Sequence, residues 1–129
     1  MQPINAQTVA DSIAADLPRD RVKAVRAIRE TDGAFVCVPD EAILAAIPLL
    51  ARQSGVFAEP AGAAAYAGAK AALDSGVLSP ADRIVVLVTG SGLKDIRSAM
   101  RVAGSGYPVA PDPAEVEKVR LALGLPALK

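Results

Sequence analysis

The feature that most constrains the fold is an apolar run that ends abruptly in a glycine-containing turn. Residues Ile84 to Val88 are all apolar and mostly β-branched, and Thr89-Gly90-Ser91-Gly92 follows them directly. A short run of this kind indicates a strand buried on both faces, which is typical of parallel sheets covered by helices. We therefore expect an α/β fold in which this segment is the central strand.

The residues Thr89 to Gly92, called the glycine turn below, are also a candidate ligand site. In open α/β sheets, ligands bind beyond the carboxyl ends of the strands. Gly90 and Gly92 permit close approach of the backbone, and a helix that begins near Leu93 would direct free N–H groups toward an anion. Glycine turns also follow strands where nothing binds, so a purely structural turn is an equal alternative on these residues alone.

Composition and charge exclude several classes of function. The chain has 129 residues, a net charge of zero and 14 basic residues spread along its length, which favours one domain over residues 1–129 and argues against nucleic-acid binding. Because it contains no histidine, we expect no histidine-dependent triad and no metal site. No segment resembles a signal peptide or a membrane span, which predicts a cytoplasmic protein. The one cysteine, Cys37, lies in an apolar run and is expected to be buried and inert.

A second apolar run and several capping signals predict further elements. Ala34 to Val38 indicates another buried strand, so segments 34–38 and 83–88 should belong to one parallel sheet. Pro48 lies within an apolar stripe and should either kink that helix or divide it in two. Asp20, Asp40 and Asp112 precede helical patterns and are expected to cap them. Helices are predicted near residues 21–32, 40–54, 60–75 and 113–123, with a shorter one that follows Asp95 and ends at Gly104.

The second segment with chemical content is Glu59-Pro60-Ala61-Gly62, called the glutamate motif below. Pro60 suits the first position of a helix, and the following alanines and glycines give a thin helix that can pack closely against a sheet or a cofactor. Glu59 could act only as the cap and dipole partner of that helix. On these residues alone, that structural role and a functional role have about equal weight.

Four segments, in the same order along the chain, resemble threonine synthases. Thr89 to Asp95 is similar to the Ser/Thr-Gly-x-Gly-x-Lys-Asp signature of fold-type II pyridoxal-phosphate enzymes, and the glutamate motif resembles a segment in which the glutamate lies near the cofactor ring. Thr8 to Ile13 and the stretch that begins at Asp112 resemble segments that flank these two in the same family. The resemblance implies the C-terminal part of such a fold, a partial three-layer parallel sheet with flanking helices.

The resemblance also identifies what the chain lacks. The family holds pyridoxal 5'-phosphate as a Schiff base on a lysine of a Ser-x-Lys-Asp-type motif, and cradles the phosphate in an Asn/Gly-rich loop; neither motif occurs here. Lys94 matches a family position that does not carry the cofactor. The resemblance therefore implies the C-terminal third of a longer enzyme, with no catalytic residue of its own and with Thr89, Glu59 and Gly90 at the cofactor. The Thr89 hydroxyl would face the ring nitrogen.

The implied activity is that of a lyase that converts O-phosphohomoserine and water to threonine and phosphate. The isolated chain is expected to be inactive and to bind no cofactor by itself. Its expected partners are the missing N-terminal portion of the enzyme or further copies of itself, in a homo-oligomer. Two alternatives remain open on the sequence. One is a non-catalytic interaction or assembly module that kept the fold, and the other is a fragment of a related threonine/serine dehydratase.

Overall fold

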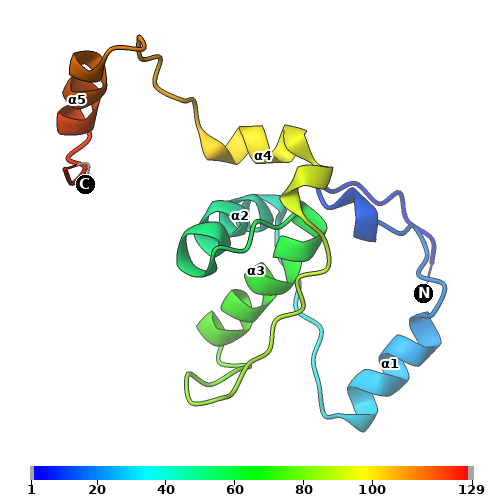
Figure 1. The fold of residues 1–129 in the computed structure, drawn as a ribbon. Helices are drawn as coiled ribbons and strands as arrows, with labels where there is room; N and C mark the ends of the chain where they lie inside the picture. The colour runs from blue at the N-terminus through cyan, green and yellow to red at the C-terminus, as the bar shows by residue number, and fades with distance from the viewer. Residues whose placement is uncertain (1, 128–129) are drawn as a thin grey trace.

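The computed structural model describes residues 2–127 and is helical over most of its regular structure (Figure 1). The predicted helices are confirmed to within about two residues at each end. None of the helices described over this range is long and apolar enough to cross a membrane. In chain order, the elements are the 3-10 turn η1 (Asp11–Ile13), α1 (Arg21–Glu30), α2 (Asp40–Ser54), α3 (Pro60–Asp74), the 3-10 turn η2 (Gly92–Lys94), α4 (Ile96–Ala103) and α5 (Pro113–Ala122).

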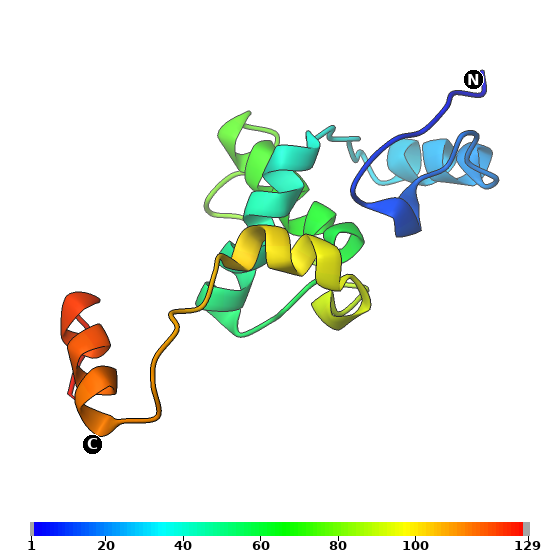
Figure 2. The ribbon, with the colours of Figure 1, turned by 90° about the horizontal axis from the view of Figure 1, so that it is seen from above.

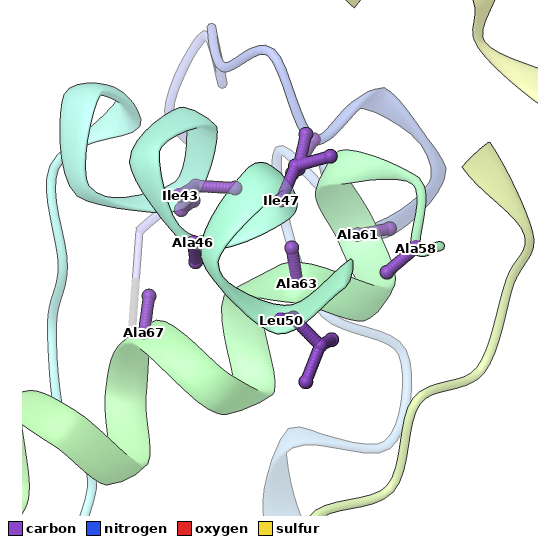
Figure 3. Packing of buried hydrophobic residues seen from close by; sticks show 9 residues of the cluster. Ile43, Ala46, Ile47, Leu50, Ala58, Ala61, Ala63 and Ala67 are labelled. Carbon is purple, nitrogen blue, oxygen red and sulfur yellow. The ribbon is translucent and has the colours of Figure 1, made fainter. Parts of the chain in front are cut away.

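The core lies between α2 and α3 and is built largely from small side chains. Ile47 of α2 is 1% exposed and belongs to one buried cluster with Ala63 and Ala67 of α3, and Figure 3 shows Ala46 of α2 facing Ala67. Alanine allows the two helix backbones to approach closely, which keeps the interior dense without large side chains. Ala10, from the N-terminal segment, is also 1% exposed and belongs to the same cluster.

The remaining helices are placed differently around this core. Helix α4 lies against α2, and Figure 2 shows it crossing the α2 and α3 pair. By contrast, α1 and α5 extend away from that pair on long connections (Figure 1). None of the residues of α1 or α5 is buried. The core that positions the motifs is therefore α2, α3, α4 and the segment around Ala10.

The predicted parallel sheet is not confirmed. Segments 34–38 and 83–88 are neither helical nor paired, and their backbone groups make no hydrogen bonds within residues 2–127. An extended segment becomes a strand only beside a neighbour that satisfies its N–H and C=O groups. In the part of the chain that the structure describes, no second strand lies alongside either segment. Phe35 is 67% exposed, Val85 87% and Leu87 74%, so one side of each run is uncovered.

The prediction for Cys37 is wrong, because its thiol is free and exposed. Burial was expected from a strand covered on both faces, and the segment around Cys37 has no such cover. Only Val38, at the end of the same run, packs against the core.

The capping predictions divide into one that is confirmed and two that are not. The carboxylate of Asp112 accepts a hydrogen bond from the Ala114 N–H at 2.9 Å and caps α5, as predicted. Asp20 is at the cap position of α1, but its side chain accepts no capping hydrogen bond. Asp40 is the first residue of α2 rather than its cap, because Pro39 occupies the cap position.

Asp40 instead ties α2 to the N-terminal segment. Its carboxylate accepts a hydrogen bond from the Thr8 hydroxyl at 2.5 Å and another from the Val9 N–H at 2.9 Å. These contacts hold the chain next to Ala10 against the core. Pro48 does not divide α2, which is continuous from Asp40 to Ser54.

Candidate functional site

The glutamate motif and the glycine turn meet at the N-terminal end of α3. The Glu59 N–H donates to the Gly90 carbonyl at 3.0 Å, and the Gly92 N–H donates to the Phe57 carbonyl at 3.0 Å. Between them, Ala58 and Ser91 form an antiparallel bridge, the one isolated β-bridge among the described residues. Two segments about thirty residues apart along the chain are therefore fixed to each other through their backbones.

The two segments can approach this closely because both contain glycines, which have no side chain. A Cβ atom on Gly62 would lie 3.1 Å from the Gly90 carbonyl oxygen, and one on Gly92 would lie 2.4 Å from the ring of Phe57. The second distance is too short for any side chain unless the ring moves. The glycines thus favour close packing of the two segments, of backbone on backbone at Gly62 and of backbone on an aromatic ring at Gly92.

Glu59 is the most buried acidic residue of the site, at 5% exposure. It stands at the cap position of α3, but its side chain makes no capping hydrogen bond, so the simple capping role considered from the sequence is not the one observed. Its Oε1 atom accepts a hydrogen bond from Lys94 Nζ at 3.0 Å. The ammonium group satisfies a carboxylate that would otherwise be buried without a partner.

Thr89 and Gly90 lie beside this ion pair. Gly90 contacts the Glu59 carboxylate directly, whereas Thr89 is exposed and its hydroxyl makes no hydrogen bond within residues 2–127. The three residues implied by the resemblance are therefore brought to one place: Glu59 and Gly90 in contact, and Thr89 next to them with a free hydroxyl.

The helix expected near Leu93 differs from the prediction. Residues Gly92 to Lys94 form only a single 3-10 turn, in which the Ser91 hydroxyl accepts from the Leu93 N–H at 3.3 Å. Helix α4 begins at Ile96, and the carboxylate of Asp95 accepts from the Ser98 N–H at 3.0 Å. Because side chains of the chain itself satisfy these N–H groups, they are not free to bind an anion.

A polar cleft of about 630 Å³ adjoins the buried glutamate. The N-terminal segment forms one wall with Thr8 and Ser12, and α4 forms the other with Arg97 and Arg101. Glu59 and Lys94 also line this cleft. No local pattern predicts the pairing of Lys94 with Glu59, because the two residues are 35 positions apart.

Two carboxylates near this cleft are stabilised in the charged form. The hydrogen bonds from Thr8 and then Val9 hold the pKa of Asp40 below its ordinary value, against a smaller opposing effect of burial, and nearby Arg101 adds to the lowering. Hydrogen bonds from the side chain and backbone of Ser98 lower the pKa of Asp95 in the same way, and the charge of Arg97 contributes.

Comparison with known proteins identifies the family to which this chain belongs. A family model described as "Pyridoxal-phosphate dependent enzyme" matches residues 2–90, which is more than half of the chain and includes Glu59, Thr89 and Gly90. The chain belongs to this family of pyridoxal-phosphate-dependent enzymes.

Within that family, the relatives found are threonine synthases. The chain is 44% identical to threonine synthase of Mycobacterium tuberculosis over 117 residues, which is 90% of this chain and 32% of the relative. It is 40% identical to the enzyme of Mycobacterium leprae over 110 residues, 85% of this chain and 31% of the relative. The enzyme of Methanocaldococcus jannaschii is 41% identical over 99 residues, 77% of this chain and 24% of the relative. The chain thus spans about a third or less of these relatives, corresponding to their C-terminal third.

Proposed function

We propose that this chain is the C-terminal part of a threonine synthase-like lyase and supplies the residues that face the ring of pyridoxal phosphate. The observation that carries the proposal is that backbone hydrogen bonds connect the glutamate motif directly to the glycine turn. These two segments carry the resemblance at the cofactor, and the fold places them together. The similarity to threonine synthases over most of the chain supports the same assignment.

Thr89 and Gly90 fit the ring-nitrogen end of pyridoxal phosphate. The exposed Thr89 hydroxyl has no partner within residues 2–127, so it can donate to a ring nitrogen, and Gly90 has no side chain to block the approach. The described lysines do not fit a covalent role, because each already pairs with an acid: Lys23 with Asp20, Lys70 with Asp74, Lys94 with Glu59 and Lys118 with Glu115. The lysine that holds the cofactor and the loop that binds its phosphate would come from outside this chain.

When bound, pyridoxal phosphate withdraws electrons from the α-carbon of an amino-acid substrate. Thr89 would hold the ring nitrogen through a neutral hydroxyl, which leaves that nitrogen largely unprotonated, whereas a carboxylate would favour its protonation. A hydroxyl therefore moderates the electron withdrawal and suits elimination and replacement at the β and γ carbons. Glu59 would lie beside the ring, with its carboxylate held in place by Lys94. The proposed overall reaction converts O-phosphohomoserine and water to threonine and phosphate.

The proposal extends to the sheet and to the partners. We infer that residues 1–129 form one part of a fold-type II domain, in which segments 34–38 and 83–88 become strands of a parallel sheet beside the remaining portion of the enzyme. Their free backbone groups and apolar side chains support this inference. We also propose that the chain associates with itself as a homo-oligomer. A cytoplasmic location remains a prediction from the sequence.

The test is reconstitution of activity from two chains. This chain is combined with the part of the Mycobacterium tuberculosis enzyme that precedes the matched region, and release of phosphate from O-phosphohomoserine is measured together with threonine. We expect activity only in the mixture, and a lower rate with Thr89→Val because the ring nitrogen would then face an apolar group in a desolvated site. Thr31→Val, at the end of α1, is the control. A stable assembly of the two chains that binds pyridoxal phosphate and makes no threonine would contradict the proposal.

A further inference from the structure

The described lysines include one, Lys94, whose partner lies in a different element. Lys23, Lys70 and Lys118 pair with acids three or four positions away on or beside their own helices, where the side chains are exposed. Lys94 instead reaches from η2 to Glu59, 35 residues earlier, and its partner side chain is only 7% exposed. The sequence resemblance gave this lysine no role, so its contact requires an explanation of its own.

The ion pair lies where it can control the glycine turn. Oε1 of Glu59, the atom that Lys94 binds, is also the atom that fills the position where a Cβ on Gly90 would lie. The backbone on both sides of this carboxylate is held by the hydrogen bonds of Glu59 with Gly90 and of Gly92 with Phe57. A carboxylate that left this position would no longer pack against Gly90, between those two bonds.

Electrostatics determines what would happen without the ammonium group. A carboxylate buried as deeply as that of Glu59 is unfavourable unless a positive charge or hydrogen-bond donors compensate it. Within residues 2–127, the Glu59 side chain has no hydrogen-bond donor other than Lys94. Loss of that donor would drive the carboxylate to turn toward the adjoining cleft and its water, away from its place beside Gly90.

We propose that Lys94 is a positioning residue: it holds the Glu59 carboxylate against Gly90 and thereby fixes the glycine turn that presents Thr89. The importance of this role for the cofactor rests on the proposed function, but the positioning itself concerns only residues of this chain. It acts through the charge of Glu59 and not through packing, because the Lys94 side chain is 61% exposed.

Hydrogen exchange of single backbone amides tests the proposal in the full chain without any cofactor. The two reporters are the N–H groups of Glu59 and Gly92, which make the bonds between the segments. We expect Lys94→Met to speed their exchange by about tenfold, and Lys94→Arg, which keeps the charge, to restore most of the protection. Lys70→Met removes an exposed ion pair on α3 and serves as the matched control, with no effect expected.

A double-mutant cycle separates the effect of charge from that of packing. In a Glu59→Gln background the neutral amide does not need an ammonium partner, so Lys94→Met should change the exchange rates by less than about threefold. Equal effects of Lys94→Met in both backgrounds, or no effect in the wild-type chain, would overturn the proposal. Because this readout requires no catalysis, its failure is distinct from a failure of the two-chain activity assay.

Discussion

The carboxylate of Glu59 occupies the space in which a side chain at Gly90 would begin. A Cβ atom there would lie 1.8 Å from Glu59 Oε1 and 2.4 Å from its Cδ, although Gly90 has no unusual backbone conformation. The glutamate cannot simply swing aside, because Lys94 holds it and the residue is buried. The requirement for glycine at this position is therefore a property of the neighbouring motif rather than of the turn itself.

We accordingly expect Gly90→Ala to destabilise the chain by about 1–3 kcal/mol, through displacement of a buried and paired carboxylate. Urea unfolding followed by circular dichroism measures the change. Gly106→Ala is the control, since a Cβ there would meet nothing within 4 Å, and it should alter the free energy of unfolding by less than about 0.5 kcal/mol. Equal stability of the two variants would refute the packing described for Glu59.

The stability contributed by the hydrogen bonds between Asp40 and the N-terminal segment should depend on pH. The pKa of Asp40 is lowered in the folded chain, so its charged form stabilises the fold above the pKa of the unfolded chain, and this contribution is lost as the pH falls through the folded value. Asp40→Asn should therefore lower the urea midpoint at pH 7, and the difference from wild type should shrink below about pH 4.

Glu41→Gln is the matched control for this measurement. Glu41 lies in the same first turn of α2 and loses the same charge, but it makes no hydrogen bond with Thr8 or Val9. If both variants shift the midpoint by the same amount at pH 7, the effect belongs to the helix dipole and not to the bonds from the N-terminal segment.

The isolated chain should not bind pyridoxal phosphate specifically. One hydrogen bond from Thr89 contributes about 1 kcal/mol, whereas micromolar binding requires about 8 kcal/mol. After mixing with the cofactor and reduction with borohydride, mass spectrometry should find only scattered, substoichiometric labelling of lysines. Stoichiometric labelling of one lysine together with threonine formation from O-phosphohomoserine would identify the chain as an active enzyme by itself.

The uncovered apolar segments predict self-association. Val85 is 87% exposed and Leu87 74%, and in an extended segment two such residues point to the same side. Light scattering should show a dimer or larger species, and Val85→Lys should shift the population toward the monomer. Val22→Lys, at a 74% exposed valine on α1, is the control. A monomer at high concentration in the wild-type chain would contradict this prediction.

Local signals in the sequence predicted the helices well but not the contacts between distant segments. The Asp112-Pro113 start of α5 and the Gly104 end of α4 follow from capping chemistry that acts within a few residues. The pairing of Lys94 with Glu59 joins residues far apart in the chain, so no local pattern indicates it. The strand predictions for 34–38 and 83–88 used side-chain pattern alone, while a strand also requires a neighbour to pair with.

At the candidate site, too, local motifs predicted which residues matter, but not the contacts that they make with distant segments. Glu59, Thr89 and Gly90 were selected through motifs, and the fold brings them together without revealing what they bind. The sequence predicts that Asp40 caps its own helix, because acids often cap helices, yet its carboxylate accepts hydrogen bonds from Thr8 and Val9. Cys37 was expected to be buried because its neighbours are apolar, but apolar neighbours do not guarantee a covering layer.

The bridge between Ala58 and Ser91 also bears on the order in which the chain folds. It closes a loop of about thirty residues that contains α3, and closing a loop of this length costs little more entropy than closing one half as long. The backbone contacts of this bridge lie within residues 57–92, so forming them requires no residue of α1 or α5. The segment from Phe57 to Gly92 can thus join its two ends once α3 has packed on α2, independently of α1 and α5. The residues proposed to meet the cofactor would then be assembled without either of those helices.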